Sequence, residues 1–414
     1  MTTFTAVIRR WPKRAYLGSV GVLWAVMMIA LRHVYPSAGD MVIVHIRWWY
    51  YMYQHGFHGI ATINDATGAD YTSVWYFIIF IFDKLGLYQH LHLEYCIKGL
   101  AAMGTIAAGI AVYFIVKTLD RNPGSWKPVV AASLVPFLPA FFLDILKTNM
   151  PDSIYLALDL FVLLAILRRR PILAWFLLGI AMSFKLMAVY IVPFLILVYF
   201  IRFAAMTVLQ RLAPVFALVG ILVASLPGIF AGQGIYEATI GTMIMRGTTG
   251  SLKGGLWDIL FTPTWSVMPD VKYDITVSAG ILFGFAAIVL VIGAFVALLL
   301  HAKDSESQLD GSFDLLVAAP IVFFSLLPSQ HEAYWSLASV FAMLVMLLRW
   351  SRSSLVVFLL LSVVSVEMYM GARLPPLVCD YLLLAVVVYM FVRVFRASKL
   401  SARFHEITPN TINW

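Results

Sequence analysis

Charged residues and cysteine are both scarce in this sequence. Asp, Glu, Lys and Arg make up 12% of the 414 residues, whereas 62% are hydrophobic and the mean hydropathy is +0.90. Soluble domains carry about 25% charged residues, so this composition excludes an ordinary soluble domain. The two cysteines, Cys96 and Cys379, lie within apolar runs and therefore predict no disulfide framework.

Internal repeats, low-complexity segments and a separate soluble domain are also missing. Many transporters are built from similar halves, so the lack of a repeat weighs against a transporter. Long apolar runs are abundant, and about 20 apolar residues cross a bilayer. We therefore predict an all-α polytopic membrane protein of 12 to 14 transmembrane helices, with residues 1–414 as one integral membrane domain. The expected spans lie at about 16–34, 72–88, 95–118, 128–146, 153–168, 171–184, 186–201, 214–231, 275–301, 314–328, 332–349, 353–371 and 376–394.

The net charge of +8 comes from short basic clusters between the apolar runs. Such clusters mark cytoplasmic loops, so the charge predicts no nucleic-acid binding. Arg9, Arg10, Lys13 and Arg14 precede the first run and no cleavage site follows it. We therefore expect a signal anchor with a cytoplasmic N-terminus.

In the first half of the chain, two ways of counting the spans give opposite orientations for the same loop. Counting spans back from the Arg168–Arg170 loop places residues 88–94 outside, whereas counting forward from a cytoplasmic N-terminus places them inside. One span is therefore miscounted. The two suspects are the run at 128–146, which Pro136 and Pro139 interrupt, and an additional half-crossing within the first outer loop.

The first outer loop, residues 35–71, carries Asp40 and the aromatic run WWYYMYQHG. Trp and Tyr favour the headgroup level of a membrane, so we predict an amphipathic helix on the outer surface. Asp40 directly follows Gly39 and is either a general base or the N-cap of that helix. We expect the histidines of this helix to be interfacial side chains rather than ligands; they are His45, His55 and His58.

Ionisable residues at membrane depth are costly, and each is a functional candidate. Asp152 and Asp159 are seven residues apart and share one helix face. Asp152 either caps its helix or binds substrate, and a bond to a neighbouring helix would also explain Asp159. Lys185 stands between two apolar runs, where it either extends to the interface or contacts a phosphate.

Two later segments carry further candidates. Arg246 and Lys253 lie in a Gly-rich part of the long outer loop at 232–274, which suits a lid over an anionic group or an ordinary solvated loop. His331, Glu332 and Tyr334 begin a late apolar run, where contacts to a sugar or phosphate are expected. One adjacent His–Glu pair lacks the spacing of a zinc motif, so no metal site is predicted.

Taken in order, these motifs resemble those of bacterial GT-C glycosyltransferases, which use polyprenyl-phosphate-linked sugars as donors. The similarity covers about residues 35–345, and ILAWFLLGIAMSFKLMAVYIVPFL is its closest stretch. Three positions depart from the family pattern: the Gln expected just before Asp152 is missing, Ser73 replaces a Pro, and Ala333 replaces an Arg. The matching segments are Gly39–Asp40, the WWYYMYQHG run, Tyr71–Thr72–Ser73, Asp152–Ser153–Ile154–Tyr155, Phe184–Lys185 and His331–Glu332–Ala333–Tyr334.

The resemblance implies a GT-C-type helical bundle that transfers a monosaccharide, with inversion, on the outer face of the inner membrane. The donor would be a polyprenyl-phosphate-linked monosaccharide and the acceptor a glycan or glycolipid hydroxyl. Asp40 would be the catalytic base, and Lys185, Arg246 and His331 would bind the donor phosphate.

The remaining candidates would contact substrate or lipid: Asp152, Glu332, Tyr334, Trp48, Trp49 and Tyr71. Some members of the superfamily use a divalent metal, but no residue pattern here requires one. Two other functions stay open, namely a transporter or lipid-linked sugar flippase, and a non-catalytic subunit of a membrane assembly.

Overall fold

The computed structural model describes residues 13–31, 45–67, 71–90, 93–120, 122, 124–148, 152–241, 271–327, 336–370 and 376–399. These residues are almost entirely helical and contain no strand beyond one isolated bridge between Ala302 and Ser398. Six of the described helices are long and apolar enough to cross a membrane, and four apolar helices are shorter. The predicted class, an all-α polytopic membrane protein, is confirmed.

The chain forms two compact units. Unit 1 comprises Met1–Leu186 and Leu212–Met243. Its helices are α2 (Lys13–Leu31), α3 (Ile46–His55), η2 (Gly56–His58), α4 (Gly59–Thr67), α5 (Ser73–Lys84), α6 (Leu87–His90), α7 (Leu93–Leu119), α8 (Lys127–Leu134), η3 (Val135–Phe137), α9 (Pro139–Leu143), η4 (Asp144–Thr148), α10 (Asp152–Leu167), α11 (Pro171–Phe184), α14 (Val215–Ala231) and η7 (Glu237–Gly241).

The framework of unit 1 is a row of four apolar helices. Helix α10 packs between α7 and α11, and α11 packs against α14. The α11–α14 crossing is very close, because a Cβ at Gly179 would overlap the carbonyl oxygen of Ala217, and one at Gly220 would overlap that of Phe176. Only glycine allows two backbones to approach in this way. The position of α11 is therefore fixed tightly by α14.

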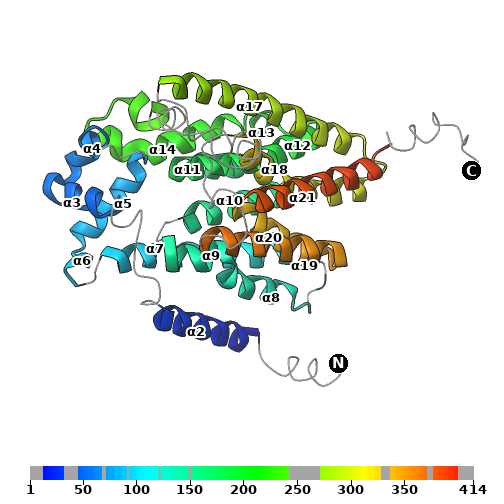
Figure 1. Cartoon of the computed structure of the whole chain (residues 1–414), viewed down its shortest axis with the longest axis horizontal. Helices are drawn as coiled ribbons and strands as arrows, with labels where there is room; N and C mark the ends of the chain where they lie inside the picture. The colour runs from blue at the N-terminus through cyan, green and yellow to red at the C-terminus, as the bar shows by residue number, and fades with distance from the viewer. Residues whose placement is uncertain are drawn as a thin grey trace, which may run out of the picture. The chain divides into compact units, whose positions relative to one another are not determined.

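Helices α3 to α6 gather at one end of this framework, where α7 begins (Figure 1). Helix α3 buries Trp48 and Met52 and exposes Tyr50 and Tyr53, which confirms its predicted amphipathic character. Trp48 and Met52 join residues of α4 and α5, such as Ile60 and Trp75, in one apolar cluster. This end of unit 1 is therefore a packed cap rather than a loose loop.

The apolar run at 72–88 does not form a membrane-spanning helix, which corrects the expected span. Helix α5 has 12 residues and is about 18 Å long, whereas the hydrocarbon core is about 30 Å thick. It ends at Lys84, and Gly86 follows with φ of +64°. Glycine in this conformation commonly ends helices. The suspected run at 128–146 is instead long enough, since Lys127–Leu146 covers 20 mostly apolar residues, with one extended residue at Leu138 between η3 and α9.

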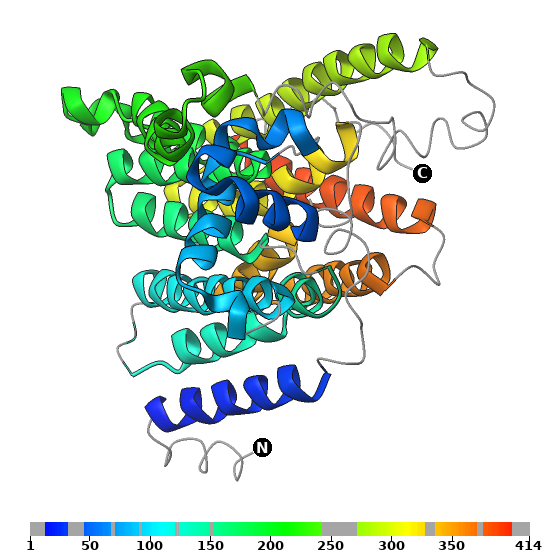
Figure 2. The same cartoon turned by 90° about the vertical axis from the view of Figure 1, so that its left-hand side faces the viewer.

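Helix α2 lies along the edge of unit 1 beside α8 (Figure 2). One side of it, with Trp24 and Met28, packs against Ala101 and its neighbours. The other side is exposed and apolar, with Val22, Val26 and Ile29 each more than half exposed. A side chain pattern of this kind suits a helix that faces lipid on one side.

Unit 2 comprises Met187–Arg211 and Ile244–Trp414. Helix α18 packs against α12, α17, α19 and α21, so it forms the centre of this unit. Its first turn is capped by Asp304, whose side chain accepts a hydrogen bond from the backbone N–H of Ser307 (2.7 Å). Unit 2 begins within η5 (Leu186–Ile191). Its other helices are α12 (Val192–Arg202), η6 (Phe203–Ala205), α13 (Val208–Arg211), α17 (Val271–Leu300), α18 (Ser305–Leu326), α19 (Ser336–Arg349), α20 (Arg352–Met370) and α21 (Pro376–Ala397).

Candidate functional site

A buried ion pair between Asp152 and Lys185 lies in unit 1. Lys185 Nζ is 2.5 Å from Asp152 Oδ1, and the two side chains are 5% and 2% exposed. Asp152 is the first residue of α10, and Lys185 caps the C-terminus of α11 in an extended conformation. The N-terminus of a helix favours an anion and the C-terminus a cation, so both helix dipoles stabilise this arrangement.

Three segments that are far apart in the sequence meet at this pair. Tyr155 lies one turn beyond Asp152, and its ring centroid is 5.7 Å from Lys185 Nζ. Thr72, just before α5, donates a hydrogen bond from its hydroxyl to the carbonyl of Ser183, two residues before Lys185. We call the ion pair of Asp152 and Lys185 the site pair. The locus around it is formed by three motifs, at residues 71–73, 152–155 and 184–185.

His45 is buried in the same locus and is only 1% exposed. Its ring packs edge-on against Trp48 (centroids 5.5 Å apart) and Trp75 (5.7 Å). Burial, together with the nearby Lys185 ammonium, lowers the pKa of His45 to about 4. The imidazole is therefore neutral near pH 7. The expectation that His45 is interfacial is wrong, because Trp75 arrives from α5 and covers it, whereas His55 and His58 are exposed as expected.

Several buried polar atoms around the site pair lack a hydrogen-bond partner within the described ranges. They are both ring nitrogens of His45, Oδ2 of Asp152 and the hydroxyl of Ser73. A buried polar atom without a partner costs about 1–3 kcal/mol. Such atoms are rare in folded proteins and call for an explanation. A polar ligand that enters this locus would supply the missing hydrogen bonds.

Asp159 lies two turns beyond Asp152 on the same helix and is fully buried. Neither of its carboxyl oxygens has a hydrogen-bond partner in the part of the chain that the structure describes. The alternative explanation of Asp159, a bond to a neighbouring helix, therefore finds no support among these residues. Asp159 stays a functional candidate for that reason.

The other predicted substrate contacts are only partly brought together. Trp48 and Tyr71 pack against each other and against His45. Trp49 is half-buried, stacks on Tyr53 (5.9 Å) and packs against the apolar cluster that contains Trp48 and Tyr71. The predicted residues Asp40, Arg246, His331, Glu332 and Tyr334 lie outside the described residues. Within the described ranges, no group of three or more His, Cys, Asp or Glu side chains could hold a metal ion.

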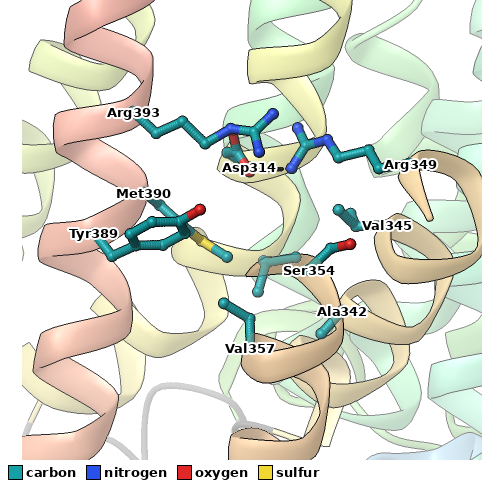
Figure 3. A pocket seen from close by; sticks show the side chains of 10 residues that line it. Asp314, Ala342, Val345, Arg349, Ser354, Val357, Tyr389, Met390 and Arg393 are labelled. Carbon is teal, nitrogen blue, oxygen red and sulfur yellow. Dashed lines mark hydrogen bonds and ion pairs between the residues drawn. The ribbon is translucent and has the colours of Figure 1, made fainter. Parts of the chain in front are cut away.

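A second polar cluster, which the sequence analysis missed, lies in unit 2. We call it the ion quartet: Asp310 and Asp314 of α18, Arg349 of α19 and Arg393 of α21. Figure 3 shows Asp314 between the two arginines. Arg349 binds Asp310 and Asp314 at 2.5 Å each, and Arg393 binds Asp314 at 3.0 Å and also pairs with Asp310. The spacing of the two aspartates, four residues apart on one helix, is the signal that could have found it.

The ion quartet does not resemble a ligand site. Its two positive and two negative charges cancel, and each arginine contacts both carboxylates. The gap beside it is lined by Ser354, Val357 and Tyr389 (Figure 3) and measures about 10 Å³. This volume holds about one water molecule. The quartet therefore joins α18, α19 and α21.

No protein-family model and no curated protein matches this chain. The resemblance to GT-C glycosyltransferases therefore depends on the short motifs alone.

Proposed function

We propose that this protein is an inverting glycosyltransferase that moves a monosaccharide from a polyprenyl-phosphate donor to a hydroxyl of a glycan or glycolipid. The observation that carries the proposal is the meeting of three motif segments at the buried Asp152–Lys185 pair, beside unpartnered polar atoms. A buried cation next to unsatisfied polar groups suits a phosphate and the hydroxyls of a sugar.

The proposed reaction is a direct displacement at the anomeric carbon. The acceptor oxygen forms a bond to that carbon while the bond to the phosphate oxygen breaks, and the hydroxyl proton passes to Asp40 as general base. The leaving phosphate is already acidic, so no general acid is required. Lys185 stabilises the charge that develops on the phosphate, and Asp152 keeps the ammonium charged and oriented. Arg246 and His331 are further phosphate ligands in this proposal.

Neutral His45 has a supporting role. A neutral imidazole carries one N–H donor and one nitrogen acceptor. Both ring nitrogens lack partners among the described residues, and the aromatic rings around them exclude water. We assign His45 to hydrogen bonds with sugar hydroxyls, and Trp48 and Tyr71 to the walls of the same locus.

The proposed topology resolves the conflict in orientation. This topology leaves out the 12-residue helix α5 and counts the other twelve of the thirteen apolar runs as crossings. With a cytoplasmic N-terminus, every basic loop then lies inside, including Lys117–Lys127 and Arg168–Arg170. In this proposal Asp152, Lys185 and the α3–α6 cap lie on the outer face of the inner membrane.

A transporter or lipid-linked sugar flippase is the second candidate. Asp159 favours it, because this carboxyl is fully buried in the middle of α10 without a partner among the described residues. Transporters place such groups near the bilayer midplane. The site pair lies instead at two helix ends, which supports the enzyme.

The test is sugar transfer by the purified protein with a panel of polyprenyl-phosphate hexoses and pentoses. We expect turnover that falls by about 10²–10³-fold in Lys185→Gln, because one preorganised charge is lost, and that is abolished in Asp40→Asn. The control is Lys84→Gln, which removes a lysine whose side chain is 62% exposed.

Each contrary outcome has a meaning. Turnover that survives in Asp40→Asn would keep the reaction class and remove Asp40 as the base. Neither turnover nor donor binding with any sugar would favour the transporter, and counterflow in proteoliposomes with Asp159→Asn would then be measured.

A further inference from the structure

A polar pocket of about 360 Å³ lies in unit 1 at the end of α7 that is remote from the site pair. It is lined by the start of α2, the last turns of α7 and the loop that leads to α8, with Lys13, Tyr113, Lys117, Asp120, Asn122 and Ser125 among its residues. The volume corresponds to about a dozen water molecules. Neither the site pair nor the proposed reaction uses this pocket.

The separation of the two places follows from α7. The hydroxyl of Ser153, next to Asp152, donates to the carbonyl of Ala101 (2.8 Å). Lys117 follows Ala101 by 16 residues on the same helix, which corresponds to about 24 Å. The pocket therefore lies near one end of α7 and the site pair near the other.

Two lysines give the pocket its positive charge. Lys13 Nζ donates to the carbonyls of Ser125 (2.8 Å) and Gly124 (3.3 Å) and lies 5.8 Å from the ring centroid of Trp126. These contacts hold the ammonium in place without neutralising it. Lys117 is exposed and has no ion-pair partner among the described residues. Its Nζ lies 5.8 Å from the centre of the Tyr113 ring.

Asp120 offsets only part of this charge. Its carboxylate accepts a hydrogen bond from the backbone N–H of Asn122 (3.1 Å), and Asn122 in turn accepts one from the backbone of Gly124 (3.0 Å). Asp120 therefore shapes the loop. Among the described lining residues, two lysines against one aspartate leave a net charge of +1. Such a pocket suits an anion with one negative charge that also carries hydrogen-bonding groups.

An apolar stripe on α7 leads to this pocket. Met103, Ile106 and Ile110 are 57%, 54% and 48% exposed. With Tyr113 and Lys117 they recur at helical spacings of three and four residues, so all five share one face of α7. Aromatic and lysine side chains that end an exposed apolar face are typical of the level of lipid headgroups.

From these observations we propose that the pocket binds the phosphodiester headgroup of an anionic membrane phospholipid, with one acyl chain along the α7 stripe. Lys13 and Lys117 contact the phosphate, and Asn122 and Ser125 offer hydrogen bonds to headgroup hydroxyls. A free phosphate shares the same anionic chemistry, but it would leave the exposed stripe on α7 unexplained. The inference is independent of the proposed function, because it uses none of the residues of the site pair.

The test is native mass spectrometry of the full-length protein after delipidation and titration with defined ligands. The ligands are phosphatidylglycerol, zwitterionic phosphatidylcholine with the same acyl chains, deacylated glycerophosphoglycerol and inorganic phosphate. We expect phosphatidylglycerol to be retained at least fivefold better than each of the others. Lys117→Gln should weaken that binding about fivefold, since one cation near a membrane surface contributes about that factor.

The control is Lys399→Gln, which removes an exposed cation of unit 2 that does not line the pocket. Equal weakening in Lys399→Gln, or equal retention of phosphatidylcholine, would overturn the proposal. Binding of inorganic phosphate as tight as that of phosphatidylglycerol would show a free-anion site and would also overturn it. If Lys117→Gln does not yield folded protein, Ile106→Ser combined with Ile110→Ser tests the acyl-chain contact by the same readout.

Discussion

The site pair of unit 1 and the ion quartet of unit 2 are both clusters of opposite charges, yet they differ in how many ion pairs each charge makes among the described residues. In the quartet each guanidinium contacts both carboxylates, a geometry that planar arginine forks favour. In the site pair Lys185 contacts one carboxylate oxygen of Asp152 at 2.5 Å. Beside it, His45 and the second oxygen of Asp152 have no hydrogen-bond partner among the described residues.

This difference separates a structural role from a binding role. A network in which every charge has an ion-pair partner rigidifies the helices that carry it; even Oδ2 of Asp314, which has no partner of hydrogen-bond geometry among the described residues, lies 3.0 Å from Arg393 Nε. Buried polar atoms with no partner of either kind, such as the ring nitrogens of His45, are costly unless a ligand supplies one. The gap beside the quartet holds about one water molecule, so no ligand is needed there. We therefore expect changes to the quartet to affect stability, and changes around the site pair to affect binding and turnover.

The largest expected effect on stability comes from breaking the quartet. Arg349→Gln leaves buried Asp314 with Arg393 alone, and we expect it to lower the free energy of unfolding by about 3–4 kcal/mol. Reversible unfolding in mixed micelles measures this. Arg352→Gln, three residues on and exposed, is the control and should stay within about 0.5 kcal/mol. A loss below 1 kcal/mol in Arg349→Gln would contradict the structural role.

Acid should distinguish the two clusters, because only the site pair has a buried histidine beside it among the described residues. The unfolded chain protonates His45 below about pH 6.5, whereas folded His45 has its pKa lowered to about 4 by burial and Lys185. His45 therefore does not lower the free energy of unfolding above pH 6.5. As the pH drops from 6.5 to 4, protonation of the unfolded chain lowers that free energy by roughly 3 kcal/mol.

The measurement for this prediction is the thermal unfolding midpoint between pH 8 and pH 4. His45→Gln should flatten the acid limb of the profile, while His55→Gln on the exposed face of α3 should leave it unchanged. An acid limb that is the same in the wild type and His45→Gln would show that another group causes it.

The smallest expected effect on stability comes from removing the site pair as a whole. Replacing both charges by apolar side chains, as in Asp152→Leu combined with Lys185→Met, avoids an unpaired buried charge, so unfolding should change by less than about 1 kcal/mol. Donor binding should nevertheless be lost. A double variant that folds and still turns over donor would place the site elsewhere in the chain.

Much of the fold could be predicted from the sequence because a membrane-spanning helix needs a run of about 20 mostly apolar residues. The apolar runs at 153–168 and 171–184 correspond closely to α10 and α11. Asp152 and Lys185 could be found as candidates because a single charge at the end of an apolar run has few explanations. Their direct contact could not be predicted, since it depends on how α10 and α11 pack.

The two errors have physical causes that sequence patterns hide. The run at 72–88 is apolar throughout most of its length, but the turn at Leu85–Gly86 stops the helix before it could cross a bilayer. His45 belongs to an interfacial helix by its neighbours in sequence. Its burial comes from Tyr71 and Trp75, which approach from a later segment.

The glycine crossing of α11 and α14 makes the site pair sensitive to positions that never touch a substrate. Gly179 precedes Lys185 by six residues, so Lys185 lies about 9 Å along the helix from the crossing. A rotation of α11 about the crossing therefore moves Lys185. A methyl group at Gly179 would push α11 away from α14 and tilt it. A tilt of about 6° over about 9 Å would displace the Lys185 ammonium by about 1 Å. Displacements of that size can reduce a reaction rate about 100-fold. Harmful natural variants would thus include a change as small as glycine to alanine at the α11–α14 crossing, which does not touch the substrate.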